Sequence, residues 1–196
     1  MSTALNGIRV MDMTHNQAGP ACGQVLGFLG ADVIKVEEPT GGDVARRNMA
    51  DEHGDSLFFL ILNANKRSLT LNLKHAEGIE VFNKLAETAD VVVENYRPDV
   101  KNRLGIDYES LKIINPRLVY ASISGFGQDG PYVKRPGVDQ IAQGMGGLMS
   151  ITGLPGQGPV RVGIPIADLT SGLYCAIGIL TALLEREVSG EGQWVQ

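Results

Sequence analysis

One aspartate, Asp168, is the strongest candidate for covalent chemistry in this sequence. It follows an apolar segment that contains Gly163 and Pro165, and it precedes a long apolar run that is typical of a helix. A carboxylate at the start of a helix accepts hydrogen bonds from free N–H groups and lies at the positive end of the helix dipole, which keeps it ionised. Such a carboxylate can attack an activated acyl group without a separate base. The same position also suits a helix N-cap with no catalytic role, and spacing alone does not separate the two.

The other nucleophilic side chains form no recognisable set. The sequence has two Cys and three His, and it has no Ser, His and Asp at the spacing of a known catalytic triad. Cys22 and Cys175 belong to no CxxC pair, so we expect neither a disulfide framework nor a metal site. A reducing compartment fits this cysteine usage, and we expect a cytoplasmic protein.

Composition is that of an ordinary globular protein of one domain or slightly more, with 196 residues, 43% hydrophobic and 20% charged. A net charge of -5 argues against a nucleic-acid partner, because the phosphate backbone would be repelled, but a small anionic ligand fits if cations cluster locally. Residues 1–7 show no secretory signal. The longest apolar run, Leu173 to Leu184, falls short of the roughly 18 residues of a membrane span, so we expect a buried helix and no membrane partner.

Short β-branched runs alternate with helical spacing along the chain. Strands are predicted at 8–12, 31–36, 68–73, 90–94 and 118–123, and helices at 21–29, 76–86, 108–114 and after Asp168. The stretch 57–62 fits neither class clearly, and 192–196 looks like the start of a further strand. This order predicts an α/β fold, a Rossmann-like parallel sheet with helices on both faces. In such sheets, ligands bind beyond the carboxyl ends of the strands.

A glycine motif at 125–130 matches the GxGxxG pattern of dinucleotide-binding loops and follows a predicted strand. That fingerprint requires a helix to open at the motif, whereas Pro131 and Pro136 follow it. No acidic residue ends a second strand about 20 residues further on. We therefore interpret the motif as a turn at the mouth of the sheet, where the backbone can also approach a ligand closely.

Cationic side chains recur near the predicted strand ends. Arg46 and Arg47 follow a Gly-rich turn, and one aromatic residue, Tyr96, accompanies a further group of cations, namely Lys66, Arg67, Lys74, Arg97, Lys101 and Arg103. A nucleotide with several phosphates needs two or three cations and a flat apolar surface for its base. The alternative is a set of ordinary surface charges. His15 lies just after the first strand, where it suits either a functional loop or a loop cap.

Read together, these segments resemble the class III CoA-transferases, the family that includes formyl-CoA transferase and the carnitine CoA-transferases. The match runs over essentially the whole chain. The segments that carry it are NGIRVMD at 6–12, QAGP at 17–20, LGADVIKVE at 29–37, NKRS at 65–68, VENYRP at 93–98, NPRL at 115–118 and SGFG at 124–127.

The resemblance implies a substrate and a role for Asp168. The substrate would be coenzyme A in the form of an acyl-CoA, with a carboxylic acid as the second partner and no metal. Asp168 would attack the thioester and pass through an aspartyl anhydride and an aspartyl-CoA thioester, and Asp139 would lie near the active site. Coenzyme A contacts would fall on His15, Asn16, Gln17, Ala18, Leu71, Asn72, Leu73, Lys74, Asn95, Tyr96, Arg97 and Arg103.

The resemblance also implies an organisation. Residues 1–196 would form the N-terminal part of a large CoA-binding domain, with the small domain and the C-terminal part absent from this chain, and the full-length protein would be an interlocked homodimer. Formyl-CoA transferases carry a basic residue and a Trp where this chain has Glu38 and Asn48, so the acid substrates stay open.

Two alternatives remain. The related alpha-methylacyl-CoA racemases pair their aspartate with a His in a Gly-His-Asp segment, but here that segment has Val138, which cannot transfer a proton, so a transferase is preferred. The second alternative is a non-catalytic CoA-binding fragment.

Overall fold

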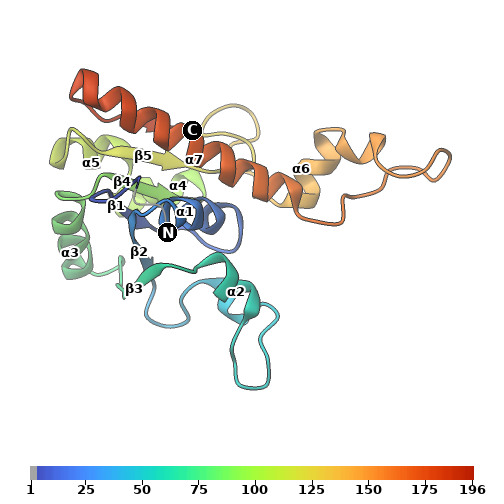
Figure 1. The fold of residues 1–196 in the computed structure, drawn as a ribbon, viewed down its shortest axis with the longest axis horizontal. Coiled ribbons are helices and arrows are strands. Elements are labelled where there is room, and N and C mark those ends of the chain that lie inside the picture. The colour runs from blue at the N-terminus through green and yellow to red at the C-terminus, as the bar shows by residue number, and fades with distance from the viewer. Residues whose placement is uncertain (1–3) are drawn as a thin grey trace.

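A parallel sheet of six strands forms the centre of the computed structural model, which describes residues 4–196 (Figure 1). Met1 to Thr3, the start of the segment in which no secretory signal is predicted, lie outside the described residues. The strand order is β3-β2-β1-β4-β5-β6, and every pairing is parallel. The strands are β1 Arg9–Asp12, β2 Asp32–Glu37, β3 Lys66–Thr70, β4 Val91–Glu94, β5 Val119–Ser122 and β6 Trp194–Val195. The predicted α/β fold with a Rossmann-like sheet is confirmed.

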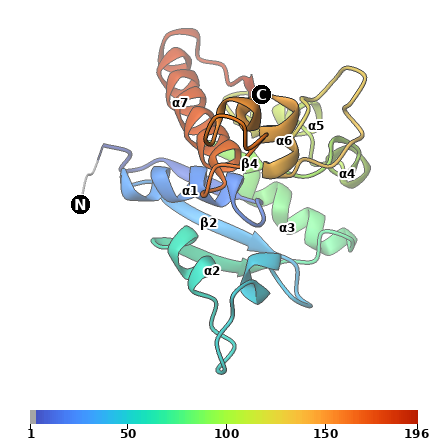
Figure 2. The same cartoon turned by 90° about the vertical axis from the view of Figure 1, so that its right-hand side faces the viewer.

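Helices cover both faces of this sheet (Figures 1 and 2). The α-helices are α1 Ala18–Phe28, α2 Leu57–Leu62, α3 Ala76–Ala86, α4 Pro98–Leu104, α5 Tyr108–Ile114, α6 Asp139–Met145 and α7 Ile166–Ser189, with 3₁₀ turns η1 Val44–Arg47 and η2 Leu148–Ile151. Alternate strand residues point to opposite faces. In β4, Val91 and Val93 pack in the cluster that includes α1 and α7, whereas Val92 packs with Phe82 of α3 and Leu111 of α5.

Some predicted boundaries shift for local reasons. The helices predicted at 76–86 and 108–114 coincide with α3 and α5, whereas β3 runs from Lys66 to Thr70 instead of 68–73. Among residues 4–196, β2 is the only strand beside β3, and it ends at Glu37 opposite Thr70. One further ladder bond forms there, from Leu71 N to Glu37 O. The unassigned stretch 57–62 is α2, whose first turn is capped by Ser56 Oγ accepting from Phe59 N at 3.1 Å.

Helix α7 is longer than its apolar run suggests. It spans 24 residues because polar residues extend it at both ends. By length and composition it could cross a membrane, since its mean hydropathy over an 18-residue window is 1.6. The length of the uninterrupted apolar run alone therefore does not exclude a membrane span. A core helix passes the same test, and one face of α7 packs in the core through Cys175, Ala176 and Ile179.

Candidate functional site

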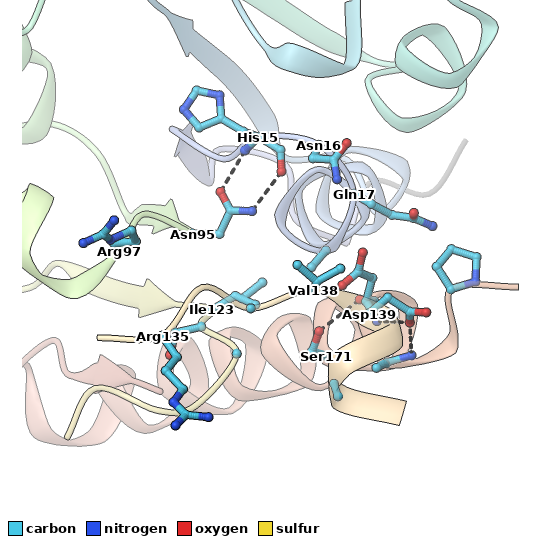
Figure 3. Close-up of a pocket in the computed structure, with 18 of the residues that line it drawn as sticks. His15, Asn16, Gln17, Asn95, Arg97, Ile123, Arg135, Val138, Asp139 and Ser171 are labelled. Atoms are coloured by element: carbon cyan, nitrogen blue, oxygen red, sulfur yellow. Dashed lines mark hydrogen bonds between the residues drawn. The ribbon is translucent and has the colours of Figure 1, made fainter. Parts of the chain in front are cut away.

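A cavity of about 580 Å³ opens at the carboxyl ends of the strands, at the point where the strand order reverses between β1 and β4 (Figure 3). The loops that follow these two strands form one wall, and α6 with the start of α7 forms the other. The predicted site residues that line it are His15, Asn16, Gln17, Ala18, Asn95, Tyr96, Arg97, Asp139 and Asp168.

The other predicted contacts lie outside this cavity. Leu71 to Lys74 follow the edge strand β3, where Asn72 Oδ1 accepts from Lys74 N at 3.0 Å and closes a turn. Arg103 lies on α4 with its guanidinium 3.7 Å from Asp99 of the same helix. Their contact with coenzyme A stays a prediction.

Asp168 is the third residue of α7 and does not cap it. The N-cap position is Pro165, and the helix N-terminus is capped from α6, because Asp139 Oδ1 accepts from Ala167 N at 2.8 Å and from Asp168 N at 3.3 Å. The N-cap alternative for Asp168 is therefore wrong, since the helix begins three residues earlier than that role requires. Within residues 4–196, no donor forms a hydrogen bond to the Asp168 carboxylate oxygens, which leaves them available to a ligand.

The electrostatic environment of Asp168 also differs from the prediction. Burial raises the pKa of Asp168 to about 6, and the negative charge of Asp139 adds to the shift. The helix dipole was expected to favour the ionised form, but desolvation has the larger effect. At neutral pH the carboxylate is still mostly ionised, and it is more basic than an ordinary aspartate.

Titration of Asp168 should therefore respond to Asp139. We expect the Asp168 carboxyl carbon to titrate near pH 6, measured by NMR with ¹³C-labelled aspartate. Asp139→Asn should lower that midpoint, because the repelling charge is removed, while burial keeps the pKa above that of a free aspartate. Glu80→Gln removes an exposed carboxylate on α3 and should leave the midpoint unchanged. An unchanged midpoint in Asp139→Asn would contradict the assigned cause.

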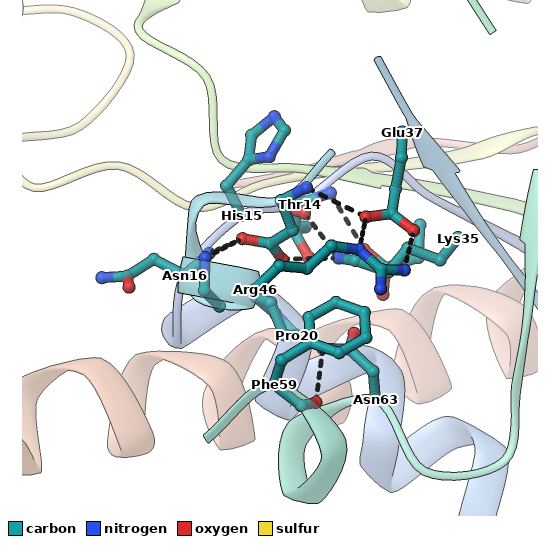
Figure 4. A network of polar contacts seen from close by, with 12 residues as sticks. Thr14, His15, Asn16, Pro20, Lys35, Glu37, Arg46, Phe59 and Asn63 are labelled. Carbon is teal, nitrogen blue, oxygen red and sulfur yellow. Dashed lines mark hydrogen bonds and ion pairs between the residues drawn. The ribbon is translucent and has the colours of Figure 1, made fainter. Parts of the chain in front are cut away.

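The loop after β1 is fixed from two sides. Asn95 clamps His15, since His15 N donates to Asn95 Oδ1 and Asn95 Nδ2 donates to His15 O, each at 2.8 Å (Figure 3). Asn16 has a left-handed φ of 65°, and its N–H donates to Asp43 Oδ1 at 2.8 Å (Figure 4). Asp43 is itself paired with Lys35 at 2.9 Å, and both side chains are buried. The side chain of Asn95 is thus committed to shaping the loop.

The surroundings of His15 favour its neutral form. Its ring lies 5.3 Å from that of Tyr96, and burial lowers the pKa of His15 below its usual value. A neutral imidazole suits hydrogen bonding to a ligand better than it suits charge pairing with a phosphate.

Several cations that the sequence suggested for phosphate binding are already paired. Lys66 is buried against Asp12 at 2.7 Å, and Lys101 is buried against Glu94 at the same distance. Arg46 pairs with Glu37 at 2.6 Å beneath the loop, as Figure 4 shows. These cations hold the strand ends together. The cavity instead contains two arginines that the sequence pattern did not single out, Arg135 and Arg161.

The glycine motif forms a turn, as predicted, and no helix opens within 125–130. Gly125 packs backbone to backbone on Gly137, because a Cβ at position 125 would lie 2.2 Å from the Gly137 Cα. Both glycines line the cavity. The motif therefore shapes the site rim without forming a dinucleotide loop.

Comparison with known proteins shows the family. Residues 5–196 match the model of CoA-transferase family III. The chain is 48% identical to a formyl-CoA:oxalate CoA-transferase of Streptomyces avermitilis, covering 100% of this chain and 47% of that protein. It is 47% identical to the protein of the same name from Afipia carboxidovorans, covering 100% of this chain and 46% of that protein.

A solved structure agrees. The crystal structure of a CaiB/BaiF family protein from Brucella suis superposes with a TM-score of 0.93 at 44% identity, covering 100% of this chain and 53% of that one. The chain thus spans about half the length of the relatives it matches. Its full-length match and shared fold confirm the resemblance found in its motifs, and the chain belongs to CoA-transferase family III.

Proposed function

We propose that this chain supplies the CoA-binding part and the nucleophile of a transferase that moves CoA between an acyl-CoA donor and a carboxylic acid acceptor. Family membership supports the transfer of CoA. The observation that carries the covalent step is the Asp168 carboxylate, half-buried in the cavity and without a donor on its oxygens in the part of the chain described. The named relatives act on formyl-CoA and oxalate, and we extend to this chain only the transfer between carboxylic acids.

The proposed reaction needs neither a metal nor an external base. An Asp168 oxygen attacks the donor thioester carbonyl, the C–S bond breaks, and the CoA thiolate leaves behind an aspartyl anhydride. The thiolate then attacks the aspartyl carbonyl, which releases the donor acid and forms an aspartyl-CoA thioester. The acceptor carboxylate displaces the thiolate to give a second anhydride. Attack of the thiolate on the acceptor acyl carbonyl releases the new acyl-CoA and regenerates Asp168.

The cavity suits this sequence of steps because Asp168 and the two loops face the same space. The loops after β1 and β4 supply His15 to Ala18 and Asn95 to Arg97, which we propose to contact CoA. Burial makes Asp168 a stronger base, and hence a better nucleophile, than an exposed carboxylate, provided that it stays ionised. Limited access of water would also protect the anhydrides from hydrolysis.

Trapping with hydroxylamine tests the covalent step. Incubation of the complete gene product with an acyl-CoA and hydroxylamine should convert Asp168 into a hydroxamate, located by peptide mass spectrometry, because both intermediates are activated acyl groups. Asp168→Asn is the matched control and should give no adduct. If CoA binds but no carboxylate is modified, the chain is a CoA-binding fragment and the proposed catalysis is wrong.

The racemase alternative has no support here, because Val138 lines the cavity where a proton-transferring group would be needed.

We also propose that residues 1–196 form the N-terminal part of a larger CoA-binding domain in an interlocked, cytoplasmic homodimer. The relatives are about twice as long as this chain. The outer face of α7 exposes apolar side chains at Leu173, Ile177 and Leu184, which are 50%, 57% and 74% exposed. A face of this kind favours coverage by further protein.

A further inference from the structure

Arg161 is an exposed cation that lines the cavity. Its Nε donates to Val162 O and its Nη2 to Gly163 O, each at 3.1 Å, and within residues 4–196 no carboxylate pairs with its guanidinium. These two bonds orient the guanidinium and leave the Nη1 hydrogens and one Nη2 hydrogen free. That outer edge matches the two oxygens of a carboxylate.

Buried side chains fix the backbone that carries Arg161. Val162 N donates to Gln143 Oε1 at 2.8 Å, and Gln143 Nε2 donates to Asp139 Oδ2 at 2.6 Å. Asp139 Oδ1 accepts from Asp168 N at 3.3 Å. Gln143 and Asp139 are only 1% and 8% exposed. The segment beside Arg161 and the N-terminus of the catalytic helix are therefore held by the same two hydrogen-bonded side chains.

The other arginines of the cavity lie on the opposite side. Figure 3 shows Arg97 and Arg135 at the end of the cavity away from Asp139. A CoA thioester that reaches Asp168 keeps its phosphates far from that residue, because the pantetheine arm lies between them. Arg97 and Arg135 therefore suit the phosphates, whereas Arg161, whose segment is hydrogen-bonded to α6 through Gln143, suits the acid.

We propose that Arg161 binds the second, non-reacting carboxylate of a dicarboxylic acid, so that the other carboxylate reaches the aspartyl group. This inference rests on the proposed function, because it assigns the acid substrate of the same site. The reacting carboxylate is a poor candidate for Arg161, since a guanidinium bound to it would lower its nucleophilicity. A monocarboxylic acid offers no second anion to this arginine.

Acids of equal chain length test the assignment. CoA transfer by the complete gene product is measured with succinate and with butyrate as acceptors, for the wild type, Arg161→Gln and Arg161→Lys. We expect the wild type to prefer succinate, and Arg161→Gln to reduce that preference roughly tenfold or more, mainly through the KM of the acid. Arg161→Lys keeps the charge without the bidentate geometry and should fall in between. Arg135→Gln is the control and should raise the KM of the acyl-CoA instead.

A wild type that does not prefer succinate, or an Arg161→Gln variant that loses activity equally with both acids, overturns the inference. Calorimetric titration with succinate and butyrate, without turnover, separates this result from failure of the proposed function. If no acid is a substrate and hydroxylamine gives no adduct, the transfer chemistry is wrong. Succinate binding that weakens tenfold in Arg161→Gln then still supports the carboxylate site, and succinate binding unaffected by the substitution overturns it.

Discussion

Asp168→Ala should reduce CoA transfer by roughly three orders of magnitude or more, because removal of a covalent nucleophile leaves only the contribution of binding and positioning. The affinity for CoA should change by no more than about threefold, since the loops after β1 and β4 are not altered. Steady-state kinetics and calorimetric titration with CoA measure the two quantities. Transfer at the native rate would show that Asp168 is not on the reaction path.

Asp168→Asn separates loss of chemistry from loss of structure. The folded-state pKa of Asp168 is raised to about 6 from 3.8, so the folded protein binds this proton more tightly than the unfolded chain does. The raised pKa stabilises the fold below the unfolded pKa, and that stabilisation disappears as the pH rises through about 6. The neutral Asn variant should thus be inactive yet melt at a higher temperature than the wild type at neutral pH. This difference should vanish in acid, where both side chains are uncharged.

The general architecture could be predicted from the short-range sequence pattern, but the capping of α7 could not. The alternation of Val91, Val92 and Val93 between the two faces follows from the two-residue period of a strand, so the sequence alone predicts the sheet. The cap of α7 comes from Asp139, 29 residues before Asp168, and only the tertiary fold joins them. The sequence therefore singled out Asp168, which lines the cavity, but it did not predict the direction of its pKa shift.

The buried ion pairs could have been predicted from charged residues that occur within the strand sequences, which motif spacing does not take into account. Lys35 interrupts the apolar run of β2, Asp12 ends β1 after Val10 and Met11, and Glu94 ends the otherwise apolar strand β4. Charges in such strands are buried and require partners, and parallel strands bring their carboxyl ends to one edge. This reasoning favours ion pairs beneath the loops, as found for Lys35 with Asp43, over free cations for phosphate. The role of Arg161 depends on hydrogen bonds to its own segment and had no such signal.

Lys66→Met should have the largest effect on stability. It removes the partner of the fully buried Asp12 and also the donor to Pro20 O and Asn63 Oδ1, each at 2.9 Å. Breaking a buried ion pair from one side costs about 3–5 kcal/mol, because the remaining charge loses its ionic partner, and Asp12 would keep only the hydrogen bonds that Thr14 donates to its Oδ1. Hydrogen–deuterium exchange of the complete gene product, followed in peptides from β1 and β3, measures the loss as lower opening free energies of these strands.

Lys84→Met is the matched control because it breaks an ion pair of the same 2.7 Å length, with Glu80 on the surface of α3. Both partners there are 66% exposed, so water replaces the lost contact and the cost should stay below about 1 kcal/mol. The double variant Asp12→Asn/Lys66→Met should recover part of the loss, since it no longer buries an unpaired charge. Equal effects of Lys66→Met and Lys84→Met would mean that burial does not set the strength of the pair.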